Sequence, residues 1–450
     1  LKKKDIGLAK TMLEAGTDVN IPATNGVTPL MAASHAGLPD MVASLLARGA
    51  SPRAVDRIGK TAMIYAAGEG HADIVRQLLA HGVDPNAAYR NDLTALMWAA
   101  GYGRVAVIRA LLDSGARTEL ADNRGKTALA MAQEGNHAEA ATLLAALAAS
   151  ASPRAYVSNE GSGTISVIDT ATDRVVATRK LGAKPRGIAV SGDGARLYVS
   201  DQTADALHVH DLASDTTIAT IALGKSPEAI YVSPDGKWIA AAVEENDLVA
   251  LVDLDSLKVA RTIRMRGKNP EHAVWSPDGR WIYVSAEDAD SVDIVDVSRA
   301  AVVKSVAVGA RPRGIAFLPD GTRAYVAAEN ADSVAVIDVA TQEVVARIAA
   351  GSRSNGVIAH PDGKRVFVTS GGKGSVQVFD TMSHKIVAEV EVGRRPWNMA
   401  LSADGRKLYV ACGRSNSVAV VDTATYAKIV DIAVENLPWG VAVAAPVRRP

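Results

Sequence analysis

Two internal repeats of different length run through the chain. Between residues 26 and 125, marker residues follow one another at intervals of 33: Gly26, Gly59, Asp92 and Gly125. From residue 156 onward the interval is 42 residues, with one step of 43, and seven aspartates mark it: Asp169, Asp211, Asp253, Asp296, Asp338, Asp380 and Asp422. A repeat of this length is one supersecondary unit that buries its apolar face only against its neighbours. The chain must therefore fold as two stacks of repeated units.

The 33-residue units have the pattern of paired short helices. Each begins with a threonine before an alanine-rich segment, and the later leucine-rich segments close on glycine: Thr28, Thr61, Thr94 and Thr127, then Gly49, Gly82 and Gly115. Threonine is a good helix N-cap, and glycine tolerates the left-handed backbone that ends a helix. These features resemble ankyrin repeats over residues 1–149, as four units after a truncated one at Asp5–Gly16. The resemblance implies a helical solenoid that binds protein partners.

The 42-residue units have the alternating pattern of β-strands. Six Asp-Gly pairs favour tight hairpin turns: Asp193-Gly194, Asp235-Gly236, Asp278-Gly279, Asp320-Gly321, Asp362-Gly363 and Asp404-Gly405. Each unit has four short strands, as in a propeller blade. The chain enters at a second strand, Ala155–Ser158, and ends after a first strand, Trp439–Val443. We predict a multidomain α + β protein: an N-terminal ankyrin-repeat α-solenoid, then an all-β seven-bladed propeller over residues 153–447, closed by its C-terminal strand.

Two phrases of the propeller carry a closer resemblance. Residues 276–285 read SPDGRWIYVS, and residues 417–425 read SVAVVDTAT. These phrases resemble the YVTN family of propellers, and within it the bacterial propellers associated with catabolism that depends on pyrroloquinoline quinone (PQQ). The resemblance implies an exported, periplasmic protein that is accessory to quinoprotein-linked oxidation. It implies no demonstrated reaction, so we expect a non-enzymatic interaction or scaffold protein.

Composition narrows the possible partners and cofactors. The 49 basic and 49 acidic residues cancel to a formal net charge of zero, which provides no basic field for nucleic acid. The longest apolar run, at 140–149, is shorter than the roughly 20 residues of a membrane-spanning helix. Cys412 is the single cysteine, so an intrachain disulfide and a cysteine-rich zinc site are excluded. We predict no nucleic-acid partner, no membrane span, no metal and no cofactor.

One position of the propeller repeat varies in a way that the rest does not. It lies in the loop that enters the innermost strand, at one mouth of the channel, and is filled by Arg186, Glu228, Glu271, Arg313, Asn355, Trp397 and Trp439. A purely structural repeat position would be filled similarly each time. We interpret this ring, with His272 next to Glu271, as a site for a small molecule or a partner. The alternative is structural: the arginines neutralise the glutamates and plug the channel, and the tryptophans cover its apolar wall.

The same ring permits an enzymatic alternative. Glu228, Glu271 and His272 are the candidate general acids and bases, while Arg186 and Arg313 are suited to hold a carboxylate or phosphate. These residue types resemble those of seven-bladed lactonases, which implies lactone hydrolysis. We favour the non-enzymatic interpretation and keep the hydrolase as the alternative.

The loops between second and third strands divide by charge. Acidic residues gather over four units, among them Glu244, Glu287 and Glu329, whereas Arg395 and Arg414 lie on the remaining side. We expect a mouth with acidic and basic sides.

The ankyrin units offer a second candidate surface. Tyr89 and Arg90 lie at an expected hairpin tip, and Trp98 and Tyr102 lie along an expected first helix. Tyrosine, tryptophan and arginine are common anchors of protein interfaces, so we predict a protein partner here. The alternative is that some of these residues pack against the propeller.

Overall fold

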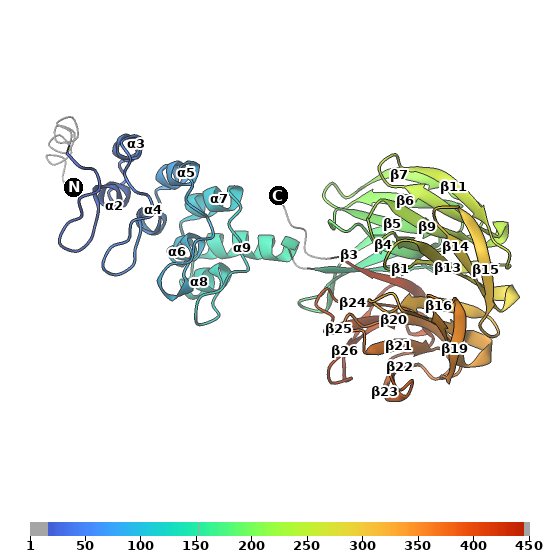
Figure 1. Ribbon diagram of the computed structural model, residues 1–450. Coiled ribbons are helices and arrows are strands. Elements are labelled where there is room, and N and C mark those ends of the chain that lie inside the picture. The colour runs from blue at the N-terminus through green and yellow to red at the C-terminus, as the bar shows by residue number, and fades with distance from the viewer. Residues whose placement is uncertain (1–16, 152, 445–450) are drawn as a thin grey trace. The chain divides into compact units, whose positions relative to one another are not determined.

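The computed structural model describes residues 17–151 and 153–444, which form two compact units (Figure 1). The expected truncated repeat at Asp5–Gly16 and residues 445–447 lie outside the described residues. The first unit is helical and the second consists of β-sheets, as the sequence predicts. In the described part of the chain, no helix is both long and apolar enough to cross a membrane.

Over residues 17–151 the helical unit stacks four pairs of helices. The pairs are α2 (Pro29–His35) with α3 (Pro39–Ala47), α4 (Ala62–Glu69) with α5 (Ala72–Ala80), α6 (Ala95–Gly101) with α7 (Val105–Asp113), and α8 (Ala128–Glu134) with α9 (Ala138–Ala151). Each first helix follows its threonine, whose hydroxyl accepts a hydrogen bond from a backbone N–H three residues on at 3.3–3.4 Å. A cap of this kind contributes about 1 kcal/mol. The predicted threonine caps are therefore present in all four pairs.

Side chains also tie each repeat to the one before it. The Nε atom of Arg104 donates to the carbonyl of Gly68 at 2.8 Å, across 36 residues of sequence. Histidines take the place of Arg104 in the preceding and the following repeat. His71 Nε2 lies 3.2 Å from His35 O, and His137 Nε2 lies 3.0 Å from Gly101 O. These contacts satisfy the carbonyls at helix C-termini that lack an intrahelical partner. They fix the register of the stack.

The second unit is a ring of seven antiparallel sheets with four strands each. In the order of the chain the strands of the first four sheets are β1 (Arg154–Asn159), β2 (Thr164–Asp169) and β3 (Arg174–Lys180); β4 (Pro185–Val190), β5 (Arg196–Asp201), β6 (Ala206–Asp211) and β7 (Thr216–Ala222); β8 (Pro227–Val232), β9 (Trp238–Val243), β10 (Leu248–Asp253) and β11 (Lys258–Arg264); β12 (Pro270–Trp275), β13 (Trp281–Ala286), β14 (Ser291–Asp296) and β15 (Ala301–Ala307). The remaining strands are β16 (Pro312–Phe317), β17 (Arg323–Ala328), β18 (Ser333–Asp338) and β19 (Glu343–Ala349); β20 (Ser354–Ala359), β21 (Arg365–Ser370), β22 (Ser375–Asp380) and β23 (Ile386–Glu391); β24 (Pro396–Leu401), β25 (Lys407–Cys412), β26 (Ser417–Asp422) and β27 (Lys428–Ala433); and β28 (Pro438–Val443).

The C-terminal strand closes the ring. The first sheet has the order β28-β1-β2-β3, and Ala155 pairs with Val443. The chain termini of this unit are thereby joined in one blade, which removes two open sheet edges. The predicted seven-bladed closure is confirmed.

The repeated aspartates stabilise turns. In each blade the carboxylate at the end of the third strand accepts backbone N–H bonds from the following turn, at 2.6–3.1 Å. Small apolar side chains fill the spaces between blades, as where Ile239 and Val252 pack with Leu207 of the preceding blade. The period of 42 therefore encodes turn chemistry and blade packing.

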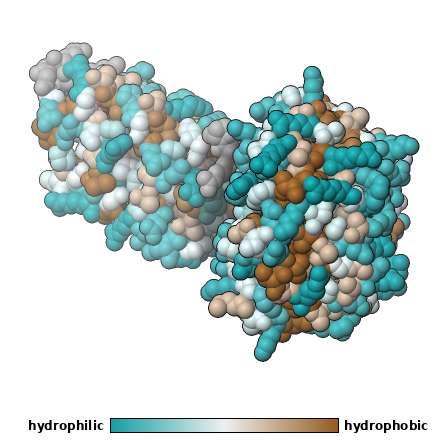
Figure 2. All heavy atoms as spheres, turned by 45° about the vertical axis from the view of Figure 1, so that its right-hand side comes forward, coloured by the Kyte–Doolittle hydropathy of each residue, from teal (hydrophilic) through white to brown (hydrophobic). Residues whose placement is uncertain are grey.

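Hydrophobic side chains also reach the surface. Figure 2 shows them gathered in patches on the propeller among hydrophilic residues. The large apolar residues that are exposed on this unit lie mainly on outermost strands: Val175, Val176, Ile218, Val345, Ile386, Val387, Ile429 and Val430. Five of these residues, Val176, Ile218, Val345, Val387 and Ile429, have no partner in the strand pairing, because each lies at the β-bulge of its outermost strand.

Candidate functional site

Two rings of equivalent positions meet at one end of the innermost strands. The first ring is the second residue of each innermost strand, the variable position described above. The second ring is the residue that follows the second strand of each blade: Glu160, Gln202, Glu244, Glu287, Glu329, Gly371 and Gly413. Ion pairs join members of both rings into two clusters, one around Arg186 and one around Arg313. Glu271, which belongs to the second cluster, lies close enough to act electrostatically on Arg186 and Glu228 of the first. We call the two clusters together the charged layer: Glu160, Arg186, Glu228, Glu271, Glu287, Arg311, Arg313, Glu329 and Arg395.

Two arginines organise the charged layer. Arg186 Nη1 lies 2.5 Å from Glu228 Oε2, and its Nε lies 3.3 Å from Glu160 Oε2. Arg313 pairs with three carboxylates, those of Glu271, Glu287 and Glu329. Glu228 has 0% of its surface exposed, and a buried carboxylate requires such partners. The ion pairs expected under the structural alternative are thus present.

Glycines let large side chains lie across the second ring. A Cβ atom at Gly371 would lie 2.9 Å from Nη1 of Arg395, whose Nη2 donates to Glu329 Oε1 at 2.6 Å. A Cβ atom at Gly413 would lie 2.5 Å from the indole ring of Trp397. Arg395 therefore crosses to the acidic side. The expected acidic side thus receives one arginine, Arg395, from the basic side.

Burial perturbs the acids of this layer. Burial raises the pKa of Glu287 to about 7, and the nearby Glu271 carboxylate adds to the shift. Burial also raises the pKa of Glu228 well above its usual range, again with Glu271 contributing. Burial alone would raise the pKa of Glu271 too, but the Arg313 guanidinium helps to hold it below its ordinary value. Glu271 is therefore the most acidic of these three glutamates, and the pKa values of Glu228 and Glu287 lie above their ordinary range.

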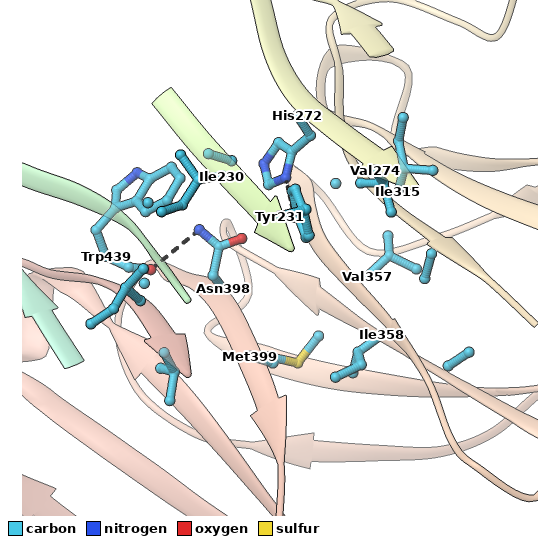
Figure 3. Close-up of a pocket in the computed structure, with 18 of the residues that line it drawn as sticks. Ile230, Tyr231, His272, Val274, Ile315, Val357, Ile358, Asn398, Met399 and Trp439 are labelled. Carbon is cyan, nitrogen blue, oxygen red and sulfur yellow. Dashed lines mark hydrogen bonds between the residues drawn. The ribbon is translucent and has the colours of Figure 1, made fainter. Parts of the chain in front are cut away.

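A cavity of about 260 Å³ lies among the innermost strands, and all seven blades contribute to its wall. Its lining is mostly aliphatic, with side chains such as Ile315, Val357 and Met399. Its polar side chains are those of Tyr231, His272 and Asn398, and its other aromatic side chains are those of Trp439 and Phe317 (Figure 3 labels all but Phe317). The lining contains no aspartate, glutamate, lysine or arginine.

The backbone leaves room for few side chains at the third position of the innermost strands. A Cβ atom at Gly356 would lie 2.2 Å from the carbonyl oxygen of Trp397, and one at Gly314 would lie 2.6 Å from that of Asn355. Distances under about 3 Å do not occur for real Cβ atoms, so these blades need glycine. Only His272 and Asn398 place a side chain larger than alanine at this position.

His272 and Asn398 both touch a neighbouring blade. The His272 Nδ1 atom lies 2.7 Å from the hydroxyl of Tyr231, and its ring stacks near Trp439 with centroids 6.2 Å apart. Asn398 Nδ2 donates to the Trp439 carbonyl at 3.2 Å (Figure 3). His272 is 2% exposed, and burial lowers its pKa to about 4, so its imidazole is neutral at pH 7.

The ring predicted from the sequence thus divides between two environments. Arg186, Glu228, Glu271 and Arg313 belong to the charged layer, whereas His272 and Trp439 line the cavity. The remaining two are elsewhere: Asn355 is buried beside Gly314, and Trp397 covers Gly413. The three candidate acid–base residues, Glu228, Glu271 and His272, therefore do not all line one cavity.

Sequence reasoning missed Glu160, Gln202 and Tyr231. Gln202 donates to Glu228, and Glu160 pairs with Arg186. The 42-residue register contained a signal for Tyr231, because its equivalents in the other blades are Ala or an aliphatic residue. A tyrosine at a position that other blades fill with small apolar residues indicates that its hydroxyl has a polar partner, here His272.

The ankyrin unit presents a continuous row of rings. Trp98 and Tyr102 stack with centroids 5.7 Å apart and planes 6° from parallel. Lys60 Nζ lies 4.7 Å from the Trp98 centroid and 5.5 Å from that of Tyr65, while His35 contacts Tyr65 edge-on at 5.4 Å. We call these five residues the aromatic ladder. The sequence indicates that Tyr65 and Trp98 occupy equivalent positions, because they are 33 residues apart.

The other two predicted residues of this unit differ from each other. Tyr89 is half-buried and packs against the helical core, and burial raises the pKa of its hydroxyl. Arg90 is exposed at the hairpin tip, where a Cβ atom at Gly59 would contact its side chain at 3.4 Å. Tyr89 thus supports the tip that presents Arg90.

Each of the two units matches a known protein family. Residues 2–89 and 85–155 each match the family described as ankyrin repeats (3 copies). Residues 236–401 match the family described as YNCE-like beta-propeller. The chain joins ankyrin repeats to a YNCE-like propeller. No curated protein sequence matches it.

Solved structures resemble the propeller unit of this ankyrin–propeller protein. Hydrazine synthase of Kuenenia stuttgartiensis is 25% identical, with a TM-score of 0.56 over 60% of this chain and 92% of that one. A functionally unknown protein from Desulfotomaculum acetoxidans is 19% identical, with a TM-score of 0.58 over 66% and 100%. A putative 6-phosphogluconolactonase from Bacteroides uniformis is also 19% identical, with a TM-score of 0.57 over 65% and 99%. The last two likenesses concern the fold alone.

Proposed function

We propose that this protein is a non-catalytic interaction protein, and that its aromatic ladder binds an acidic segment of a partner protein. The observation that carries the proposal is the continuity of the ladder. It begins at His35 in one repeat, passes through Tyr65 and Lys60 in the next, and reaches Trp98 and Tyr102 in the third. A row of this kind offers an extended segment several contacts in sequence.

The ladder has the chemistry of an interface anchor. Tyr102 is 52% exposed although it stacks on Trp98, so one ring face remains available. Tyrosine and tryptophan give large contact areas at low conformational cost and dominate binding energy at protein interfaces. A tyrosine exposed to this degree supports a partner that covers it.

The charges beside the ladder favour an acidic partner. Three hairpin tips present exposed arginines, Arg57, Arg90 and Arg124, against one exposed aspartate, Asp92. Asp56 and Asp122 are buried and accept backbone N–H bonds of their own turns, and Asp122 also pairs with Arg124 at 2.7 Å. The outward basic charge of this edge therefore comes from Arg57 and Arg90. An acidic segment would gain both attraction and orientation from it.

Apolar surface lies next to these arginines. Ile58 follows Arg57 at one tip and is 55% exposed. We therefore expect the bound segment to combine aspartate or glutamate with a large apolar or aromatic residue.

The proposal includes a location. The protein acts in the periplasm, accessory to quinoprotein-linked oxidation, and the support is the resemblance of the blade phrases at residues 276–285 and 417–425. Fractionation of a bacterium that expresses the natural gene with a C-terminal tag tests this part. Recovery of the tagged protein in the periplasmic fraction is expected, and recovery only in the cytoplasm would contradict the location without affecting the ladder.

A peptide-display selection on the full chain tests the binding proposal. Enriched peptides should carry acidic residues beside an aromatic or large aliphatic residue, and their binding should be lost in Tyr102→Ala. Ile429→Ala is the matched control, because Ile429 is an exposed apolar residue of the propeller. Peptides that bind wild type and Tyr102→Ala equally would overturn the proposed surface.

A further inference from the structure

The central cavity of the propeller has no part in the interaction proposed above. Its wall comes from the innermost strands of all seven blades, and its volume is about 260 Å³. An apolar cavity of ~150 Å³ holds a benzene molecule. This cavity therefore has room for one substituted aromatic ring or a molecule of similar size.

Polar groups with unused hydrogen-bonding capacity gather in one part of the wall. The Nε2 atom of His272 is buried and has no hydrogen-bond partner among the described residues. The Oδ1 atom of Asn398 likewise receives no hydrogen bond within the part of the chain described, although Nδ2 of the same amide donates to Trp439. The Tyr231 hydroxyl, which contacts His272 Nδ1, keeps one further lone pair.

An unpaired buried polar group costs about 1–3 kcal/mol, which is why such groups in native proteins have partners or bound molecules. His272 gives stronger evidence for a bound molecule than Asn398 does. Glycine or alanine would avoid the cost of the unpaired nitrogen, and four other blades have glycine at this position. Figure 3 shows His272, Tyr231 and Asn398, which belong to three different strands, around one space. The aliphatic side chains of Val357, Ile358 and Met399 complete the wall.

We propose that this cavity binds a small neutral molecule with a hydroxyl group on an apolar body, with the hydroxyl held by Asn398 beside the Tyr231–His272 pair. A hydroxyl both donates and accepts, so it matches the Asn398 oxygen and either tautomer of the imidazole. The apolar body lies against the aliphatic part of the wall.

The charge of the ligand follows from the wall. Among the described residues no charged side chain lines the cavity, and His272 is neutral at pH 7 because burial lowers its pKa to about 4. An ion in this space would lose its hydration without gaining a counter-charge. The ligand is therefore neutral, and carboxylates of the same size are excluded.

Three probes of matched size test the proposal on the full chain. Benzyl alcohol has the hydroxyl, toluene lacks it, and benzoate replaces it with a charge. Calorimetry should show saturable binding of benzyl alcohol, roughly tenfold weaker binding of toluene, and no binding of benzoate. Benzyl alcohol should also shift the side-chain amide resonances of Asn398 in ¹⁵N spectra.

Variants separate the site from adventitious binding. Asn398→Leu should bind benzyl alcohol and toluene within about twofold of each other, whereas Asn330→Leu, at an exposed asparagine, should keep the tenfold preference. Ala316→Leu fills part of the cavity and should weaken both probes.

Several outcomes would overturn the proposal. These are equal affinity for benzyl alcohol and toluene in wild type, an unchanged preference in Asn398→Leu, or an absence of saturable binding, which would mean that the cavity holds water only. If Asn398→Leu does not fold, the Asn398 amide resonances of wild type decide: a shift with benzyl alcohol supports the site, and no shift refutes it.

Discussion

The hydroxyl of Tyr231 lies 2.7 Å from Nδ1 of His272, so strands β8 and β12 share a buried polar pair across two blades. Tyr231→Phe should remove the partner of a buried ring nitrogen and lower the free energy of unfolding by about 1–3 kcal/mol. Thermal unfolding of the full chain, followed through its β-sheet signal, measures the change.

Tyr283 provides the control for that substitution. Tyr283 is a fully buried tyrosine, whereas Tyr231 is partly buried, and the Tyr283 hydroxyl has no hydrogen-bond partner among the described residues. Tyr283→Phe should therefore be neutral or stabilising. Equal losses in the two variants would contradict a specific role for the Tyr231–His272 bond.

Removal of Arg313 tests the charged layer. Its guanidinium pairs with Glu271, Glu287 and Glu329, so Arg313→Met leaves three buried carboxylates without their shared counter-charge. A loss of about 3–5 kcal/mol in unfolding free energy is expected. Arg299→Met, at a side chain that is 73% exposed, should change it by under about 0.5 kcal/mol.

The charged layer also predicts a pH dependence. The pKa of Glu287 is raised to about 7 in the folded chain, above its ordinary value of 4.5. The folded state then binds this proton more tightly, so its contribution to stability is full below about pH 4.5 and is lost as the pH rises through 7. Wild type should lose stability between pH 5 and pH 8 by more than Glu287→Gln does, by on the order of 1–2 kcal/mol after solvent screening.

The comparison of unfolding at pH 5 and pH 8 checks this sign. Asp255→Asn, at an exposed turn residue, is the control and should show the wild-type dependence. If Glu287→Gln also shows the wild-type slope, the raised pKa is not present.

The repeats made most of the fold predictable. The intervals of 33 and 42 residues fix the repeating units, and Trp439–Val443 supplies the strand that the first blade lacks. Turn aspartates and helix-capping threonines act within a few residues of sequence, so their roles can be inferred from local spacing.

The candidate sites were predictable only in part. The ring at Arg186 and its equivalents was visible because a repeat exposes positions that vary. The division between the charged layer and the cavity was not visible, because it depends on how far a side chain reaches. Arg395 crosses a glycine to reach Glu329, 66 residues earlier, and no local pattern encodes that distance.

The affinity of a display-selected acidic peptide for the full chain tests the central claim most directly. Isothermal calorimetry should give a dissociation constant about tenfold higher for Tyr102→Ala than for wild type, and a similar loss for Lys60→Ala at low salt. Ile429→Ala should remain within twofold of wild type, and circular dichroism should show that all variants are folded. Unchanged affinity in Tyr102→Ala and Lys60→Ala would contradict the aromatic ladder as the binding surface.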